Sequence, residues 1–257
     1  MIYLLYSLLG LAPSFIWLLF YLRKDRHPEP NRMVLVVFIL GMLMGPLAIL
    51  FELFFKWLFS PVDLAEFSRL LSIRNWSFFI NIVFIAPIVE EFLKYGVVRF
   101  KILKHSEFDE PLDAMLYMII AALGFAAIEN LLLIFQQPML EFKDALILIT
   151  LRFLSATLVH ALASGTIGYW LALSLRNPEK RLSLLAKGFA IAIFFHAGYN
   201  YLIWLFDNPA FSYLSFILIA ALIASMALIV SRSFMNLKRS HAICKICKPE
   251  SILKQNP

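Results

Sequence analysis

Apolar stretches alternate with short polar connections along almost the whole of the 257-residue chain. Each stretch reaches the length of about 20 residues that a helix needs to cross the hydrocarbon core of a membrane. Prolines, which interrupt helices, fall in the connections, as Pro61 and Pro178 do. The pattern therefore predicts seven membrane-spanning helices, at about residues 2–22, 33–59, 78–98, 113–135, 145–174, 184–206 and 211–234.

The composition agrees with this pattern. Hydrophobic residues make up 61% of the chain, whereas about 45–50% is typical of soluble domains. The expected fold is an all-α, polytopic membrane bundle, with residues 1–235 as a single transmembrane domain and 236–257 as a basic cytoplasmic tail. The run 145–174 is longer than a simple span, which predicts a tilted helix or a first turn outside the hydrocarbon.

The distribution of charge predicts the orientation of the chain in the membrane. Most of the 23 lysines and arginines lie in the first, third and fifth connections and in the tail. By the positive-inside rule these segments are cytoplasmic, so we expect the N-terminus outside and the C-terminus in the cytoplasm. The net charge of +6 does not indicate nucleic-acid binding, because the basic residues lie in short segments that flank the apolar runs.

Two of the cytoplasmic connections contain acidic residues and prolines. The first, Asp25-Arg-His-Pro-Glu-Pro30, is predicted to form a rigid turn with solvated charges. In the other, Asp109 or Asp113 is placed to cap the following helix, where a carboxylate opposes the positive helix end.

Three ionisable residues, Glu90, Glu91 and Lys94, lie within the apolar run 78–98. Ionisable groups are costly at membrane depth, so by default they indicate a functional site. On a helix, Lys94 follows Glu90 by four residues and Glu91 by three, so its ammonium group reaches either carboxylate. The alternative is a structural ion pair that helps helices to associate.

The next three runs carry further polar side chains. Arg152, near the outer end of its run, is expected to extend towards the membrane interface. The others lie at roughly mid-span, and two of them, four residues apart, share one helix face. Polar groups at one depth in four consecutive helices need internal partners, which predicts a shared hydrated cavity. The residues in these three runs are Glu129, Asn130, His160, His196 and Asn200.

This set of side chains is compatible with several kinds of chemistry. A glutamate can deprotonate a water, while a histidine and an asparagine amide stabilise the charge that develops on a carbonyl oxygen. The same glutamates and histidines can bind a divalent metal or relay protons in a transporter. The absence of an obvious internal repeat argues against a transporter. A catalytically silent membrane scaffold is a further alternative.

Several motifs occur in an order and spacing that resemble the PrsW family of membrane proteases, distant relatives of the CAAX prenyl endopeptidases. The resemblance covers most of the chain between Asp25 and Asn200. It rests on Asp25-Arg-His-Pro-Glu-Pro30, Pro87-Ile-Val-Glu-Glu-Phe-Leu-Lys94, Asp109-Glu-Pro-Leu-Asp113, Gly124-Phe125 with Glu129-Asn130, His160 with Gly165 and Gly168, and His196 with Tyr199-Asn200.

The resemblance implies a membrane-embedded endopeptidase in which Glu90 or Glu91 activates a water. Glu129 stands where the CAAX relatives carry a histidine, and His196 with Asn200 resembles their oxyanion pair. We expect a reaction without a cofactor, and the alternative is a zinc-dependent one. The implied catalytic residues are Glu90, Glu91, Glu129, His160, His196 and Asn200, supported by Lys94 and Asn130, and the alternative zinc ligands are Glu91, Glu129, His160 and His196.

The resemblance also implies where the protein acts and on what. We expect a multi-pass protein of the bacterial inner, or plasma, membrane whose partners are the lipid bilayer and a membrane-spanning protein substrate. An anti-sigma factor is the substrate type that the family suggests, and a homo-oligomer is compatible with the sequence. In the tail, His241, Cys244 and Cys247 offer three soft ligands. Structural zinc sites usually take four, which favours a solvated basic tail.

Overall fold

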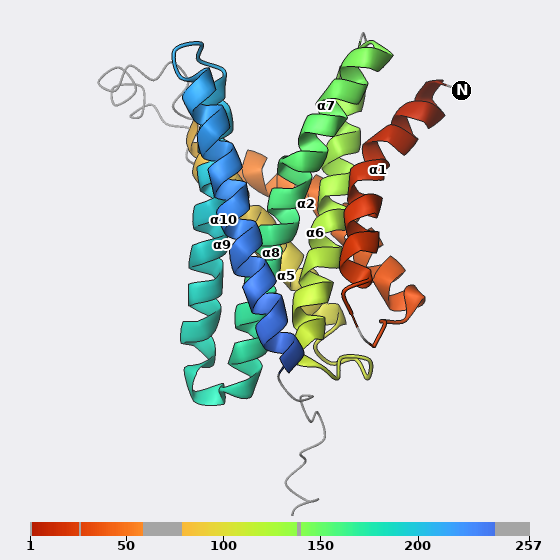
Figure 1. Ribbon diagram of the computed structural model, residues 1–257, viewed down its shortest axis with the longest axis vertical. Coiled ribbons are helices and arrows are strands. Elements are labelled where there is room, and N and C mark those ends of the chain that lie inside the picture. Colours follow the sequence, from red (N-terminus) through yellow and green to blue (C-terminus); the bar gives the residue numbers. More distant parts are fainter. Residues whose placement is uncertain (1, 26, 59–78, 138–139, 240–257) are drawn as a thin grey trace, which may run out of the picture.

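The computed structural model describes residues 2–25, 27–58, 79–137 and 140–239, and within these ranges the chain is helical and contains no strand (Figure 1). The prediction of an all-α fold is confirmed. The helices are α1 (Ile2–Leu22), α2 (Asn31–Leu58), the π-helix η1 (Asn81–Ile85), α5 (Ala86–Lys101), α6 (Pro111–Phe135), α7 (Phe142–Leu154), α8 (Ala156–Arg176), the short 3₁₀ helix η2 (Pro178–Lys180), α9 (Arg181–Phe206) and α10 (Ser212–Arg239).

Six helical segments of the described chain are long and apolar enough to cross a membrane. The predicted seventh, the run 78–98, forms η1 and α5. It is not among the six because α5 is only 16 residues long and carries the charged residues on which the site depends. The ends that the charge pattern assigns to the cytoplasm, including the last turns of α1, α5 and α10, gather at one end of the bundle (Figure 1). The orientation itself stays a prediction.

The run 145–174 belongs to the helical segment Phe142–Arg176, one of the six candidate spans, and its 35 residues agree with the expectation that it is too long for a simple span. It breaks at Ser155, whose φ of −124° and ψ of −92° separate α7 from α8. The Ser155 hydroxyl donates to the Leu151 carbonyl oxygen at 2.7 Å and accepts from the Tyr199 hydroxyl at 3.0 Å. A serine that bonds back to the preceding turn bends a helix. The sequence did not predict this break because the local bond does not change hydropathy. A tilt of the segment, or a first turn outside the hydrocarbon, stays a prediction.

Helix α6 forms the centre of the bundle, and almost every residue from Pro111 to Ala127 is buried. Close approach of neighbouring helices depends on glycine. A Cβ on Gly124 would lie 2.0 Å from the Phe38 carbonyl oxygen of α2, and one on Gly168 of α8 would lie 2.5 Å from the Met115 Cα. Small residues let helix backbones approach in lipid. These contacts hold α2 and α8 against α6.

Helix α10 continues to Arg239, so the first four residues of the predicted tail, 236–239, are helical. The boundary between the transmembrane domain and the tail stays a prediction. Residues 240–257, which include His241, Cys244 and Cys247, lie outside the described residues.

The connection before α2 packs against the start of α6. Glu29 is 8% exposed and accepts a hydrogen bond from the Tyr117 hydroxyl, so the expectation of solvated charges was wrong for this residue. Asp113 Oδ2 accepts from the backbone N–H groups of Asp109 at 2.9 Å and Glu110 at 2.8 Å. Asp113 therefore caps α6 as predicted, as part of a capping box with Glu110 at the N-cap.

Burial makes the stability of the protein depend on the protonation of Glu29. Desolvation, with the nearby Asp113 charge adding to it, raises the pKa of Glu29 from its usual 4.5 to about 8. The folded protein then keeps a proton that the unfolded chain releases between these values. Stability is full below about pH 4.5 and is lost as the pH rises through about 8, by at most about 1.4 kcal/mol per pH unit.

We therefore expect Glu29→Gln to flatten the pH dependence of the free energy of unfolding. The measurement is denaturant unfolding in detergent at about pH 5 and about pH 8, which bracket most of the shift. Other groups titrate in both proteins, so the test is the difference between them. Equal pH dependence in the two proteins would contradict the assignment.

Candidate active site

One cavity of about 330 Å³ brings together side chains from α2, η1, α5, α6, α7, α8 and α9. Five of the six residues predicted to be catalytic line it. The sixth, Glu91, lies behind the cavity wall, as do the predicted supporting residues Lys94 and Asn130. The polar lining residues are Glu52, Glu90, Glu129, Arg152, His160, His196, Tyr199, Asn200 and Asp207.

Glu91 is fully buried, and each of its carboxylate oxygens has a partner. Oε1 accepts from Lys94 Nζ at 2.8 Å and lies 3.1 Å from His196 Nδ1. Oε2 accepts from the Ser164 hydroxyl at 2.6 Å. With these contacts the carboxylate anchors other groups and is not presented to the cavity.

Glu90, in contrast, presents its carboxylate to the cavity. Its Oε2 lies 3.3 Å from Lys94 Nζ, 3.6 Å from His160 Nδ1 and 3.8 Å from His196 Nε2. The sequence left open which of the two glutamates acts on a water. The geometry favours Glu90, because Glu91 is occupied on both oxygens.

The two histidines stand edge to face, with ring centroids 4.9 Å apart and planes at 88°. Each has a carboxylate behind it: His160 Nε2 lies 2.9 Å from Glu129 Oε2, and His196 Nδ1 lies 3.1 Å from Glu91 Oε1. A carboxylate accepts an N–H, so we assign the proton of each neutral ring to that nitrogen. The other nitrogen of each ring then carries a lone pair and lies within 4 Å of Glu90 Oε2, and for His160 this nitrogen also lies 2.9 Å from Lys94 Nζ.

Glu129 is held from the side of α7. Arg152 Nη2 donates to Glu129 Oε2 at 2.7 Å, and Arg152 Nε donates to Asn130 Oδ1 at 2.5 Å. Asn130 Nδ2 in turn donates to the Thr157 hydroxyl at 3.2 Å. The expectation that Arg152 extends to the interface was wrong. The partly exposed carboxylate of Glu129 offers it a stronger partner than water does, because a charge-assisted hydrogen bond is roughly twice as strong as a neutral one.

Asn200 completes the π-helix η1. In η1 the Ala86 N–H donates to the Asn81 carbonyl oxygen five residues earlier. Continuing this register would pair the Ile82 carbonyl with residue 87, which is a proline and has no N–H. Asn200 Nδ2 donates to the Ile82 carbonyl at 2.9 Å and supplies the missing bond. Asn200 thus ties α9 to the start of α5, in addition to lining the cavity.

Sequence reasoning missed Glu52, Ser164 and Asp207 of this region. Glu52 of α2 lines the cavity beside Glu90 and Glu129, and Ser164 holds Glu91. A signal for Glu52 was present: it follows Gly41, Gly45 and Ala48 at helical spacing, and such a stripe of small residues faces other helices. Nothing in the sequence distinguishes Ser164 from other small polar residues.

Comparison with known proteins identifies the family. A family model described as "PrsW family intramembrane metalloprotease" matches residues 29–229, which include every residue of the cavity. The chain belongs to the PrsW family. The resemblance found in the sequence motifs is confirmed, and the chain is accordingly a membrane peptidase.

Curated PrsW relatives resemble the chain over most of its length. It is 31% identical to Protease PrsW of Geobacillus kaustophilus over 195 residues, which cover 76% of this chain and 77% of the relative. It is 28% identical to Protease PrsW of Oceanobacillus iheyensis over 194 residues, covering 76% and 80%. Protease PrsW of Bacillus subtilis is 26% identical over 209 residues, covering 80% and 86%. No solved structure matches the chain significantly.

Proposed function

We propose that this PrsW-family peptidase hydrolyses a peptide bond of a membrane-spanning protein in the cavity, with Glu90, His160 and His196 around the reacting water. One observation carries the proposal. Each histidine is fixed from behind by a carboxylate, Glu129 or Glu91, and turns its other nitrogen towards Glu90. Three groups aimed at one point from three helices form a site prepared for a ligand.

The arrangement fits a divalent metal ion. One atom from each of Glu90, His160 and His196 can be chosen so that all lie within 4.8 Å of one another. Glu90 Oε2 lies 3.6 Å from His160 Nδ1 and 3.8 Å from His196 Nε2. Zinc ligands at about 2.0–2.1 Å in tetrahedral geometry stand roughly 3.3–3.5 Å apart, and two histidines with one glutamate form a known catalytic zinc set.

Two further features support a metal site in the cavity. Histidines that bind metals usually donate the N–H of the other ring nitrogen to a carboxylate, and here a carboxylate lies beside one nitrogen of each ring. The charges around the cavity also leave room for a cation, because five carboxylates lie in or behind its lining with only two fixed cations when all are ionised. These groups are Glu52, Glu90, Glu91, Glu129 and Asp207, with Lys94 and Arg152. The proposed ligands therefore include Glu90 in place of Glu91 and Glu129, which the sequence suggested.

Within this proposal the chain's own residues have separate tasks. When bound, zinc supplies a Lewis acid that polarises a water or a carbonyl. Glu129 and Glu91 fix the ring orientation of His160 and His196, and Arg152 fixes Glu129. The carboxylates of Glu52 and Glu129 line the cavity and are placed to accept the proton of the attacking water. Asn200 holds the π-helix that leads into Glu90.

A second mechanism, without metal, is favoured by one contact. Lys94 Nζ lies 2.9 Å from His160 Nδ1, the nitrogen that would face the metal. In that mechanism Glu90 accepts the proton of a water whose oxygen attacks the peptide carbonyl, and it returns this proton to the leaving amine as the C–N bond breaks. The sequence left open whether Glu90 or Glu91 has this role. This mechanism requires a proton on both ring nitrogens of His196, so that its Nε2–H and the remaining amide N–H of Asn200 stabilise the negative charge on the carbonyl oxygen.

The type of substrate and the cellular location are proposals that go beyond the family assignment. We propose a single-pass membrane protein as substrate, of the anti-sigma-factor type that the family resemblance suggests, and the bacterial plasma membrane as the location. The outward faces of the helices expose many large apolar side chains, among them Leu4, Leu50 and Phe216. These suit contact with lipid and with the membrane helix of a substrate.

The test combines metal analysis with cleavage. Intact protein, purified in detergent without chelator, is expected to contain about one zinc per chain, the stoichiometry of a site with three protein ligands. His196→Ala should lose the metal, and His105→Ala, outside the cavity, should keep it. Cleavage of a panel of single-pass membrane proteins is measured with and without chelator, and with zinc added back.

The outcomes distinguish the metal-dependent mechanism from the metal-free one. Chelator-sensitive cleavage restored by zinc supports the metal site. Cleavage by metal-free protein that survives the chelator supports the second mechanism. If His196→Ala and Glu90→Gln both cut as fast as the intact protein, the cavity is not the active site.

A further inference from the structure

A second pocket, of about 390 Å³, lies between α1, α8 and α10 and shares no lining residue with the candidate active site. Its walls are mostly aromatic and aliphatic. Trp17, Phe20 and Tyr21 come from α1, Leu158 and Leu162 from α8, and Phe234 from α10. Within the span of these helices such a pocket faces acyl chains, and its size is in the range of small-molecule sites.

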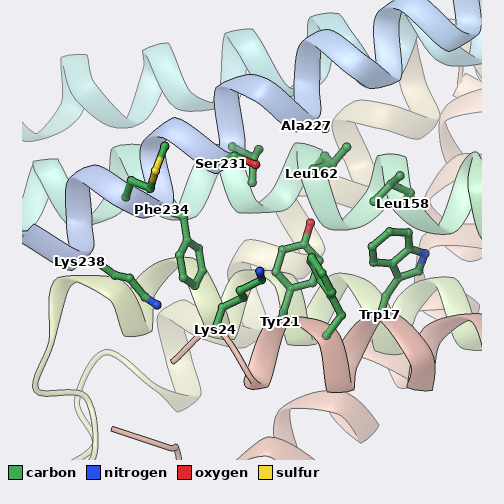
Figure 2. A pocket seen from close by; sticks show the side chains of 12 residues that line it. Trp17, Tyr21, Lys24, Leu158, Leu162, Ala227, Ser231, Phe234 and Lys238 are labelled. Atoms are coloured by element: carbon green, nitrogen blue, oxygen red, sulfur yellow. The ribbon is translucent and has the colours of Figure 1, made fainter. Parts of the chain in front are cut away.

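The pocket is charged at one end. Figure 2 shows Lys24 and Lys238 at that end and Trp17 with Leu158 at the other. Each lysine extends over a ring of the pocket: Lys24 Nζ lies 4.9 Å from the Phe20 ring centroid, and Lys238 Nζ lies 5.4 Å from that of Phe234. Within the described part of the chain, neither ammonium group forms an ion pair with a carboxylate.

The charged end has the depth of a lipid headgroup. Lys24 follows the last turn of α1, and Lys238 lies in the last turn of α10. Both ends belong to the side of the bundle that the charge pattern assigns to the cytoplasm. The cytoplasmic leaflet carries the anionic lipids that attract basic residues next to the membrane.

We infer that this pocket binds an anionic phospholipid of the cytoplasmic leaflet, with the phosphate between Lys24 and Lys238 and an acyl chain along Trp17, Leu158 and Leu162. The two positive charges at one end of the pocket match the anionic headgroup of such a lipid. The apolar remainder of the pocket matches its acyl chain. The inference does not depend on the proposed catalytic chemistry.

Charge complementarity distinguishes the lipid from the other candidate occupants. A second copy of the chain with the same orientation would bring its own basic cytoplasmic end to the depth of Lys24 and Lys238. The membrane helix of another protein is usually flanked by lysine and arginine on this side too. Both would place positive charge against positive charge, whereas a lipid phosphate is negative.

Trp17 provides a built-in reporter for the test. The protein is reconstituted in phosphatidylcholine bilayers that contain a fixed fraction of brominated phosphatidylglycerol or of brominated phosphatidylcholine. Bromine quenches tryptophan fluorescence at short range. The signal of Trp17 is the difference between intact protein and Trp17→Phe, which removes the contribution of the other tryptophans.

We expect Trp17 to select brominated phosphatidylglycerol over brominated phosphatidylcholine by a factor of about five or more, the contribution of roughly one lysine at an anionic surface. The double variant Lys24→Gln, Lys238→Gln should lower this factor to about one. The matched control is Lys180→Gln, Lys187→Gln, two exposed lysines at the same end of the bundle but outside the pocket. It should keep the selectivity.

Four results would overturn the inference. Equal quenching by the two lipids in intact protein would mean that the lysines only extend to the interface. An equal loss of headgroup selectivity in the control variant Lys180→Gln, Lys187→Gln would mean that general surface charge attracts the lipid. Competition by inorganic phosphate would indicate a free anion. Quenching that falls as protein density rises, without headgroup preference, would mean that a second copy covers the pocket.

Discussion

Glu90→Gln is expected to lower the rate of substrate cleavage by about 10²–10⁴-fold, the range over which a group that moves a proton contributes. The substitution keeps the size of the side chain and removes its charge. Glu90 faces the cavity, with Lys94 Nζ at 3.3 Å and the two histidine nitrogens at 3.6 and 3.8 Å. Both proposed mechanisms require its charge, one as proton acceptor and the other as metal ligand.

Substitution of the neighbouring Glu91 distinguishes a residue that acts in catalysis from one that stabilises the site. Glu91→Gln leaves Glu90 in place and removes the charge to which Lys94 Nζ donates at 2.8 Å. We expect it to cost stability as well as rate, whereas Glu90→Gln costs mainly rate. Glu107→Gln, an exposed acid outside both pockets, is the matched control and should change neither quantity.

The measurements are the initial rate of cleavage at saturating substrate and the unfolding midpoint in detergent, on the same preparations. A folded Glu90→Gln protein that cuts at the rate of the intact chain would show that Glu90 neither moves the proton nor holds the metal. The same loss of rate in Glu107→Gln would point to a preparation effect.

Hydropathy predicted the fold well because the bilayer imposes a simple rule. A chain in lipid must satisfy its backbone bonds within each segment, so apolar length alone indicates a helix. The break at Ser155 escaped this rule because it depends on one hydroxyl and on the Tyr199 side chain of a distant helix. The π-helix η1 escaped it as well, since its extra residue is stabilised by Asn200 of α9.

The candidate site followed from the cost of polar groups in lipid, and this argument worked unevenly. Glu90, Glu129, His160 and His196 stand out in apolar runs, and the structure brings them to one cavity. The cost of a polar group in lipid marks the residue but does not specify its partner, so the sequence predicted Arg152 at the interface, whereas it pairs with Glu129. Which glutamate of the pair faces the cavity depends on helix rotation, which a two-residue motif does not specify.

Lys94→Met is expected to destabilise the protein by about 3–5 kcal/mol, the cost of removing one partner of a buried ion pair. Lys94 and Glu91 are both fully buried, and the ammonium group donates to Glu91 at 2.8 Å and to Glu90 at 3.3 Å. It also lies 4.3 Å from the centre of the Phe125 ring. Methionine fills similar space without charge, so the loss reports mainly the carboxylates left without their counter-ion.

A double-mutant cycle isolates the pair. The double variant, Lys94→Met with Glu91→Gln, also removes the Glu91 charge that Lys94→Met alone leaves without a counter-ion. We therefore expect the double variant to be more stable than Lys94→Met alone, because a neutral buried pair costs less than a lone buried charge. The coupling energy should exceed about 1 kcal/mol, within the range for residues in contact. The free energy of unfolding in detergent is the quantity to measure.

The exposed Lys187→Met serves as the control and should stay within about 0.5 kcal/mol of the intact protein. If the effects of Lys94→Met and Glu91→Gln simply add, the two side chains do not share a buried charge pair and Glu91 is anchored by Ser164 and His196 alone. A clear coupling would mean that Lys94 keeps Glu91 charged behind His196. The geometry of His196 towards Glu90 would then depend on an ammonium group that does not line the cavity.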